Sequence, residues 1–105
     1  MTQQREFYQR MKQQHPELLS AYEALGEAAR KAGPLEGKTA ALVRLALSVA
    51  AELEGGSHSA VNKALDAGCT HDEIRHVATL AVTTLGFPSM VRARAWIEDV
   101  LGKTT

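Results

Sequence analysis

The chain has 105 residues, and its twelve basic and twelve acidic residues give a formal net charge of zero. This length predicts a single domain over residues 1–105, and the balanced charge argues against nucleic acid or an anionic membrane as a partner. Hydrophobic residues make up 45% of the chain and aromatic residues only 5%, so most apolar side chains are small or aliphatic. A small helical domain cannot bury all of them, which predicts that one helical face packs against a second copy of the chain.

The first third of the chain predicts two helices. Residues 3–14 are mostly polar and offer few apolar side chains to a weakly amphipathic helix. Pro16 suits the first turn of a second helix, because its missing N–H needs no partner there. Apolar residues recur at helical spacing until Gly33 and Pro34 end the pattern.

A long apolar helix is predicted to begin near Lys38 and to end at Gly55-Gly56. Six residues fall on one continuous face at helical spacing: Leu42, Leu45, Ala46, Val49, Ala50 and Leu53. Val43 and Leu47 widen the apolar surface, which is typical of a helix buried on most sides. The diglycine is therefore predicted to be the hinge between this helix and the next.

Three further helices are predicted after the hinge. Ser57 suits the N-cap of a short helix that Gly68 closes in a left-handed conformation. Thr70 and Glu73 form a capping box that opens a helix reaching Leu85. Pro88 begins the last helix, which ends near residue 102. No segment shows the alternation of a β-strand, so the fold class is predicted to be all-α, with about six helices.

Four segments occur in an order and spacing that are typical of one protein family: LEGKT at 35–39, AAELEGG at 50–56, ALDAGCTHDEI at 64–74 and GFP at 86–88. By these segments the chain resembles the carboxymuconolactone decarboxylase family, which includes the alkylhydroperoxidase D-like proteins. The resemblance implies an alkylhydroperoxidase D-like helical bundle that assembles into homo-oligomers, trimers or hexamers. Residues 35–102 would form the family core and residues 1–33 an N-terminal helical extension.

The residues that give this family its thiol peroxidase activity are not found where the resemblance places them. Peroxidase members carry a Cys-x-x-Cys-x-x-x-His segment with a glutamate upstream. The matching positions here are Leu53, Gly56, Ala60 and a position near Ala41. Cys69 lies after the short helix and has no second cysteine to resolve a sulfenic acid. Thiol peroxidase activity is therefore not expected.

His58 is the candidate catalytic residue, with Glu54 and Glu52 as acids that could orient it. A histidine–carboxylate pair at the end of a helix can transfer protons. The alternative interpretation is a solvent-exposed histidine in a turn.

Two functions follow from these interpretations. The first is a small oligomeric binding or accessory protein with a small-molecule ligand. The second is a lyase or decarboxylase that uses His58 as general acid–base on a small lactone or carbonyl compound.

The remaining candidates have simpler interpretations. Asp72, Glu73 and His76 share a helix face, as some metal ligands do, but a capped helix start explains them without a metal. Trp96 is expected in the core or an interface, and Cys69 is expected to be a small buried residue. No metal or cofactor is predicted. The single cysteine, the polar N-terminus and the short apolar runs predict a cytoplasmic location.

Overall fold

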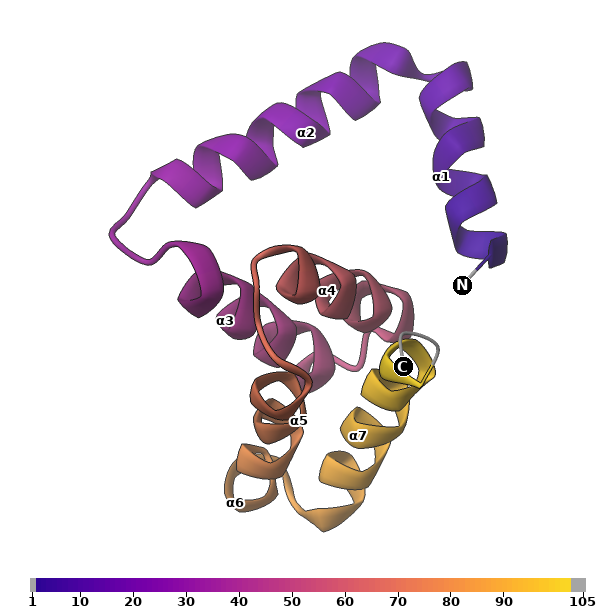
Figure 1. The fold of residues 1–105 in the computed structure, drawn as a ribbon. Helices are drawn as coiled ribbons and strands as arrows, with labels where there is room; N and C mark the ends of the chain where they lie inside the picture. The colour runs from indigo at the N-terminus through magenta and orange to yellow at the C-terminus, as the bar shows by residue number, and fades with distance from the viewer. Residues whose placement is uncertain (1, 103–105) are drawn as a thin grey trace. The chain divides into compact units, whose positions relative to one another are not determined.

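The computed structural model describes the backbone of residues 2–102 and the side chains of residues 5–102. Over these residues the secondary structure consists of seven helices with no strand, so the all-α prediction is confirmed (Figure 1). The chain divides into two compact units, with the boundary between Glu36 and Gly37. None of the helices over residues 2–102 is long and apolar enough to cross a membrane.

The first unit is a pair of helices, α1 (Thr2–Gln14) and α2 (Pro16–Lys31). Pro16 lies in the first turn of α2, as predicted. The helices are joined by polar contacts: the Tyr8 hydroxyl donates to Glu23 Oε2 at 2.9 Å, and Lys12 Nζ lies 3.3 Å from the same oxygen. Leu19 is the one buried hydrophobic side chain described in this pair, which therefore has very little core of its own.

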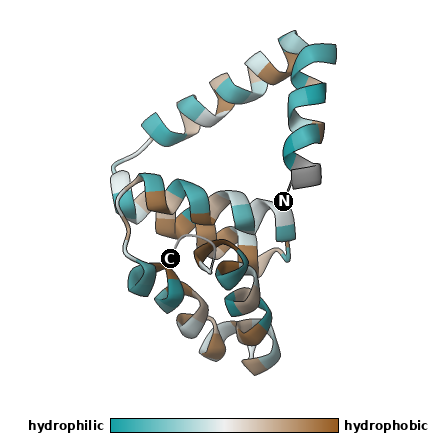
Figure 2. Cartoon of the chain, turned by 45° about the vertical axis from the view of Figure 1, so that its right-hand side comes forward, coloured by the Kyte–Doolittle hydropathy of each residue, from teal (hydrophilic) through white to brown (hydrophobic). Residues whose placement is uncertain are grey.

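The second unit consists of α3 (Gly37–Ala50), α4 (Glu54–Asp66), α5 (His71–Leu80), α6 (Val82–Leu85) and α7 (Phe87–Leu101). Helix α4 packs against α3 and α7, and α5 packs against α7. Their shared core includes the fully buried Leu45, Val61, Ile74, Ile97 and Leu101. Hydrophobic residues recur along these helices in Figure 2, whereas α1 is largely hydrophilic.

The corner between α4 and α5 follows its sequence signals closely. Gly68 has φ +92°, its N–H donates to Leu65, and the next N–H donates to Ala64, which together form a Schellman motif. Thr70 then caps α5 by accepting from the N–H of Glu73 at 3.0 Å, while the Glu73 carboxylate accepts from the N–H of Thr70 at 2.8 Å. The predicted C-cap and capping box are both confirmed, and they fix where α4 ends and α5 begins.

The predicted diglycine hinge is wrong. Helix α3 ends at Ala50 and α4 already begins at Glu54, so Gly55 and Gly56 lie in the first turn of α4. Glu52 makes the turn with φ +61°, a left-handed conformation that is uncommon for a residue with a side chain. Ser57 is consequently not the N-cap, which is Leu53, but a buried residue inside the helix.

Two other expectations need correction. The helix predicted from Thr70 to Leu85 is interrupted at Ala81, and its last turn is the separate α6. Helix α3 is not buried on most sides within the chain, because Val43 is 42% exposed and Leu47 is 67% exposed. Burial of that face by a second copy of the chain stays a prediction.

Candidate functional site

His58 lies inside α4, and its imidazole is buried. Because α4 begins at Glu54, His58 comes one helical turn after the helix start and not in the connecting turn. The residue is only 5% exposed. The interpretation of His58 as a solvent-exposed turn residue is therefore wrong.

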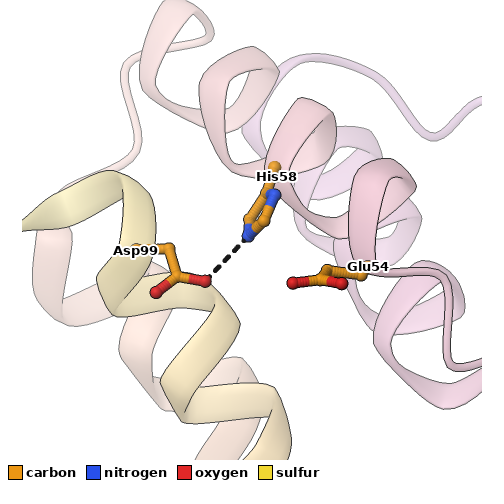
Figure 3. A group of neighbouring side chains, drawn as sticks. All are labelled: Glu54, His58 and Asp99. Carbon is orange, nitrogen blue, oxygen red and sulfur yellow. Dashed lines mark hydrogen bonds and ion pairs between the residues drawn. The ribbon is translucent and has the colours of Figure 1, made fainter. Parts of the chain in front are cut away.

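The partner of His58 is a carboxylate on the last helix. His58 Nε2 lies 3.0 Å from Oδ2 of Asp99, which belongs to α7 (Figure 3). The side chain of Asp99 is 49% exposed, whereas that of His58 is 7% exposed. The pair therefore combines a buried imidazole with a carboxylate that solvent can reach.

Glu54 completes a group of three side chains. It precedes His58 by four residues on α4, so both project from the same side of the helix. One ligand atom each of Glu54, His58 and Asp99 lie within 4.8 Å of one another. Figure 3 shows both carboxylates near the imidazole edge that carries Nε2. In residues 5–102, this is the one group of three His, Cys, Asp or Glu side chains close enough to hold a metal ion.

Glu52, the other predicted acid, has a different partner. Its Oε1 accepts a hydrogen bond from Arg92 Nη2 at 2.6 Å. The Arg92 guanidinium also lies over the ring of Trp96, 5.6 Å from its centroid. Glu52 thus joins the turn between α3 and α4 to α7, and of the two predicted acids it is Glu54 that lies in the His58 group.

The second ring nitrogen of His58 constrains how the imidazole carries its hydrogen. Nδ1 is buried and has no hydrogen-bond partner among the described residues. A hydrogen on Nδ1 would therefore be a buried donor without an acceptor, which is unfavourable. Among the two tautomers, this favours the one that carries its hydrogen on Nε2 and donates it to Asp99.

Cys69 lies apart from this chemistry. It is 5% exposed, and its thiol is placed to donate a weak hydrogen bond to the carbonyl oxygen of Lys38 at 3.9 Å. Burial, followed by the negative charge of Glu73, raises the pKa of the Cys69 thiol. A raised pKa lowers the thiolate fraction, and the thiolate is the reactive form. The prediction that Cys69 is a small buried residue is confirmed.

The other sequence candidates are accounted for by local structure. Glu73 serves the capping box, Asp72 lies 3.9 Å from Arg75, and His76 is exposed. The predicted reading of this face as a capped helix start is therefore confirmed. Trp96 is half-buried beside Arg92.

The position of Asp99 in this group is not evident from the amino-acid sequence. Asp99 is 41 positions from His58, and nothing in the local pattern of α7 distinguishes it from an ordinary surface acid. Only the packing of α4 against α7 brings the two together.

Comparison with known proteins identifies the scaffold. The sequence model of the carboxymuconolactone decarboxylase family matches residues 16–99, a region that includes α2. The crystal structure of an apo carboxymuconolactone decarboxylase family protein from Legionella pneumophila is similar, with a TM-score of 0.84 and 25% sequence identity. The match covers 99% of this chain and 93% of that one. No curated protein matches the sequence.

Proposed function

The chain belongs to the carboxymuconolactone decarboxylase family, and from that premise we propose that it is a lyase or decarboxylase without thiol chemistry. Its substrate would be a small lactone or carbonyl compound that binds at Glu54, His58 and Asp99. The observation that carries the proposal is the 3.0 Å pair between a buried imidazole and a solvent-reaching carboxylate. A buried histidine with a fixed tautomer presents its N–H as a hydrogen-bond donor at a defined atom.

Each side chain has a separate task in this proposal. Glu54, which is exposed, transfers the proton at the substrate carbon next to the carbonyl group: its carboxylate accepts a proton, and its carboxylic acid, once protonated from solvent, donates one. His58 donates a hydrogen bond from Nε2 to the oxygen on which negative charge develops, when the substrate replaces the exposed Asp99 carboxylate as acceptor. Asp99 holds the ring in that tautomer between turnovers. Hydrogen-bond donation to a developing oxyanion stabilises reactions that pass through an enolate.

The proposal also accounts for the state of the thiol. The family positions for two cysteines are occupied by Leu53 and Gly56, and the chain has one cysteine in total. That cysteine is buried and has a raised thiol pKa. Both conditions oppose attack on a peroxide.

The test is a turnover assay with small lactones and β-keto carboxylates, following ring opening and release of carbon dioxide. We expect Glu54→Gln to lower kcat/KM by roughly 10²–10⁴-fold, the usual contribution of a general acid or base. Glu52→Gln is the matched control, because it removes a carboxylate two residues earlier in the chain that is bonded to Arg92 instead. Equal activity of Glu54→Gln and Glu52→Gln, or hydroperoxide turnover that Cys69→Ser abolishes, would refute the proposal.

A second candidate is a non-catalytic binding or accessory protein that acts as a homo-oligomer in the cytoplasm. The exposed apolar residues of α3, with Leu47 67% exposed, favour it. It predicts that wild-type protein binds small carbonyl compounds without converting them, and that light scattering after size exclusion gives the mass of a trimer or hexamer.

A further inference from the structure

We propose that Glu54, His58 and Asp99 form a binding site for a divalent transition-metal ion, with His58 Nε2 and one oxygen of each carboxylate as ligands. The site is the one on which the proposed function rests, but ion binding is argued from geometry and charge and is measurable without a substrate. The three ligand atoms already lie within 4.8 Å of one another.

The distance between His58 Nε2 and Asp99 Oδ2 is suitable for two ligands of one metal ion. Two ligands that are each about 2.1 Å from an ion, at angles between octahedral and tetrahedral, lie about 3.0–3.4 Å apart. His58 Nε2 and Asp99 Oδ2 are separated by 3.0 Å. Glu54 is exposed in the first turn of α4, so its carboxylate is free to close onto the ion by side-chain rotation.

The charges around the site also favour a cation. Among residues 5–102, Glu54 has no basic partner, and Asp99 has only the imidazole of His58. The acids that lie close to Glu54 and Asp99 in sequence do have basic partners. Glu52 is paired with Arg92, and Glu98 is paired with arginines on two helices. Two carboxylates that converge on one imidazole without a guanidinium therefore carry uncompensated negative charge, which an ion of charge +2 would balance.

The ligand set indicates which ions fit. One imidazole and two carboxylates, with no thiolate, suit Zn²⁺, Mn²⁺, Fe²⁺ or Co²⁺ better than Mg²⁺, which prefers oxygen ligands. Three protein ligands leave coordination positions open for a water molecule or a substrate oxygen. A bound ion would supply Lewis acidity there, in place of the hydrogen that Nε2 donates in the metal-free site.

The burial of His58 limits the expected affinity. Coordination through Nε2 moves the ring hydrogen to Nδ1, which has no acceptor among the described residues. Loss of such an outer hydrogen bond lowers metal affinity by roughly 10–100-fold in known sites. We therefore expect micromolar binding and not the tight binding of a structural zinc site.

The experiment is calorimetric titration of the chelator-treated full chain with Zn²⁺, and separately with Mn²⁺ and Mg²⁺. We expect one Zn²⁺ or Mn²⁺ per chain, weaker Mg²⁺ binding, and a rise in Tm on addition of Zn²⁺. Glu54→Gln and Asp99→Asn should each weaken Zn²⁺ binding at least tenfold. Both positions reach solvent, so these variants are expected to fold. Asp66→Asn is the matched control, because it removes an exposed carboxylate from the same helix and should leave the affinity unchanged.

The outcomes separate this inference from the proposed function. Absence of binding up to millimolar Zn²⁺, or equal affinity in Asp99→Asn and Asp66→Asn, would overturn the metal site whatever the turnover assay gives. One ion per chain, lost in Glu54→Gln and Asp99→Asn, would establish the site even if no lactone or keto acid is converted. X-ray absorption of the zinc-bound protein should show nitrogen and oxygen neighbours, and a sulfur neighbour would contradict the assignment.

Discussion

Two adjacent carboxylates on α7, those of Glu98 and Asp99, face different surroundings. Glu98 accepts two hydrogen bonds from Arg75 of α5, at 2.7 and 3.1 Å, and another from Arg94 one turn earlier on α7. These bonds hold the pKa of Glu98 down to about 2. Asp99 instead faces the buried imidazole of His58 and the carboxylate of Glu54.

The difference comes from the helix itself. Successive residues of an α-helix point about 100° apart, so Ile97, Glu98 and Asp99 face three different neighbours. Ile97 is fully buried in the core, Glu98 ties α7 to α5, and Asp99 faces α4. The acid that stabilises the fold is surrounded by arginines, and the acid assigned to function is not. Four substitutions test whether these roles are separate.

The largest effect is expected at the core residue. Ile97→Ala should lower the free energy of unfolding by about 2–5 kcal/mol, because it removes a fully buried side chain and leaves a cavity. Val91→Ala on the same helix is the control: Val91 is 48% exposed, so its loss should change stability by about 0.5 kcal/mol or less. Urea denaturation measures both, and equal effects would mean that this side of α7 is not the core side.

Glu98→Gln should have the next largest effect. It should lower the free energy of unfolding by about 1–2 kcal/mol at pH 7, a figure that allows for solvent screening of this partly exposed cluster. In the wild type the pKa of Glu98 is lowered from 4.5 to about 2 on folding, so Glu98 stabilises the folded state above pH 4.5. That contribution is lost as the pH falls from 4.5 towards 2. Wild-type stability should therefore drop through this range, and Glu98→Gln should show a shallower drop. Parallel curves would remove Glu98 as the cause.

Asp99→Asn should change stability by about 1 kcal/mol or less, because the amide oxygen can still accept from Nε2. It should nevertheless weaken Zn²⁺ binding at least tenfold and lower turnover, whereas Glu98→Gln should leave Zn²⁺ affinity and turnover unchanged. The pair of variants is measured by urea denaturation, zinc titration and the turnover assay. If Glu98→Gln impaired ion binding as much as Asp99→Asn, the division of roles along α7 would be wrong.

Arg94→Gln should have the smallest effect, a loss of about 0.3–0.5 kcal/mol, as is usual for an exposed ion pair one helical turn apart. Arg75 keeps both of its bonds to Glu98 in this variant. Thermal denaturation at low and at 0.5 M salt measures the effect, which salt should reduce further. A loss as large as that of Glu98→Gln would show that Arg94, and not Arg75, dominates the cluster.

The helices could be predicted from sequence wherever a local signal sets the boundary. Gly68, Thr70 and Glu73 act within a few residues of one another, so their pattern predicts the α4–α5 corner without knowledge of the rest. Pro16 begins α2 and Pro88 lies in the first turn of α7 for an equally local reason. The same signals support the family resemblance, which the comparisons confirm.

The turn between α3 and α4 could not be predicted in this way. Glycine usually favours a break, yet here Glu52 adopts the left-handed conformation and the glycines are helical. A Cβ on Gly56 would lie 3.1 Å from Leu53 Cβ, so this glycine allows close packing rather than a turn. The contact lies within the first turn of α4, where the N-cap is Leu53, and residue type alone does not distinguish such a helical glycine from one that breaks a helix.

The candidate site was predicted only in part for a similar reason. His58 and Glu54 are four residues apart, and sequence proximity was enough to associate them. Asp99 lies 41 positions further on, and its role depends on how α7 crosses α4. Glu52 was grouped with His58 by proximity, but Arg92, 40 positions away, holds it elsewhere.

The buried thiol of Cys69, at the corner between α4 and α5, can be used to measure local opening of the structure. Cys69 is the sole cysteine of the chain and is 5% exposed, so an alkylating reagent reaches it only when the corner opens. The rate of labelling by iodoacetamide therefore reports how readily this corner opens, without an engineered label site. Substitutions that loosen the packing of the five-helix unit should speed this labelling, whereas those that alter only the chemistry of Asp99 should leave it unchanged.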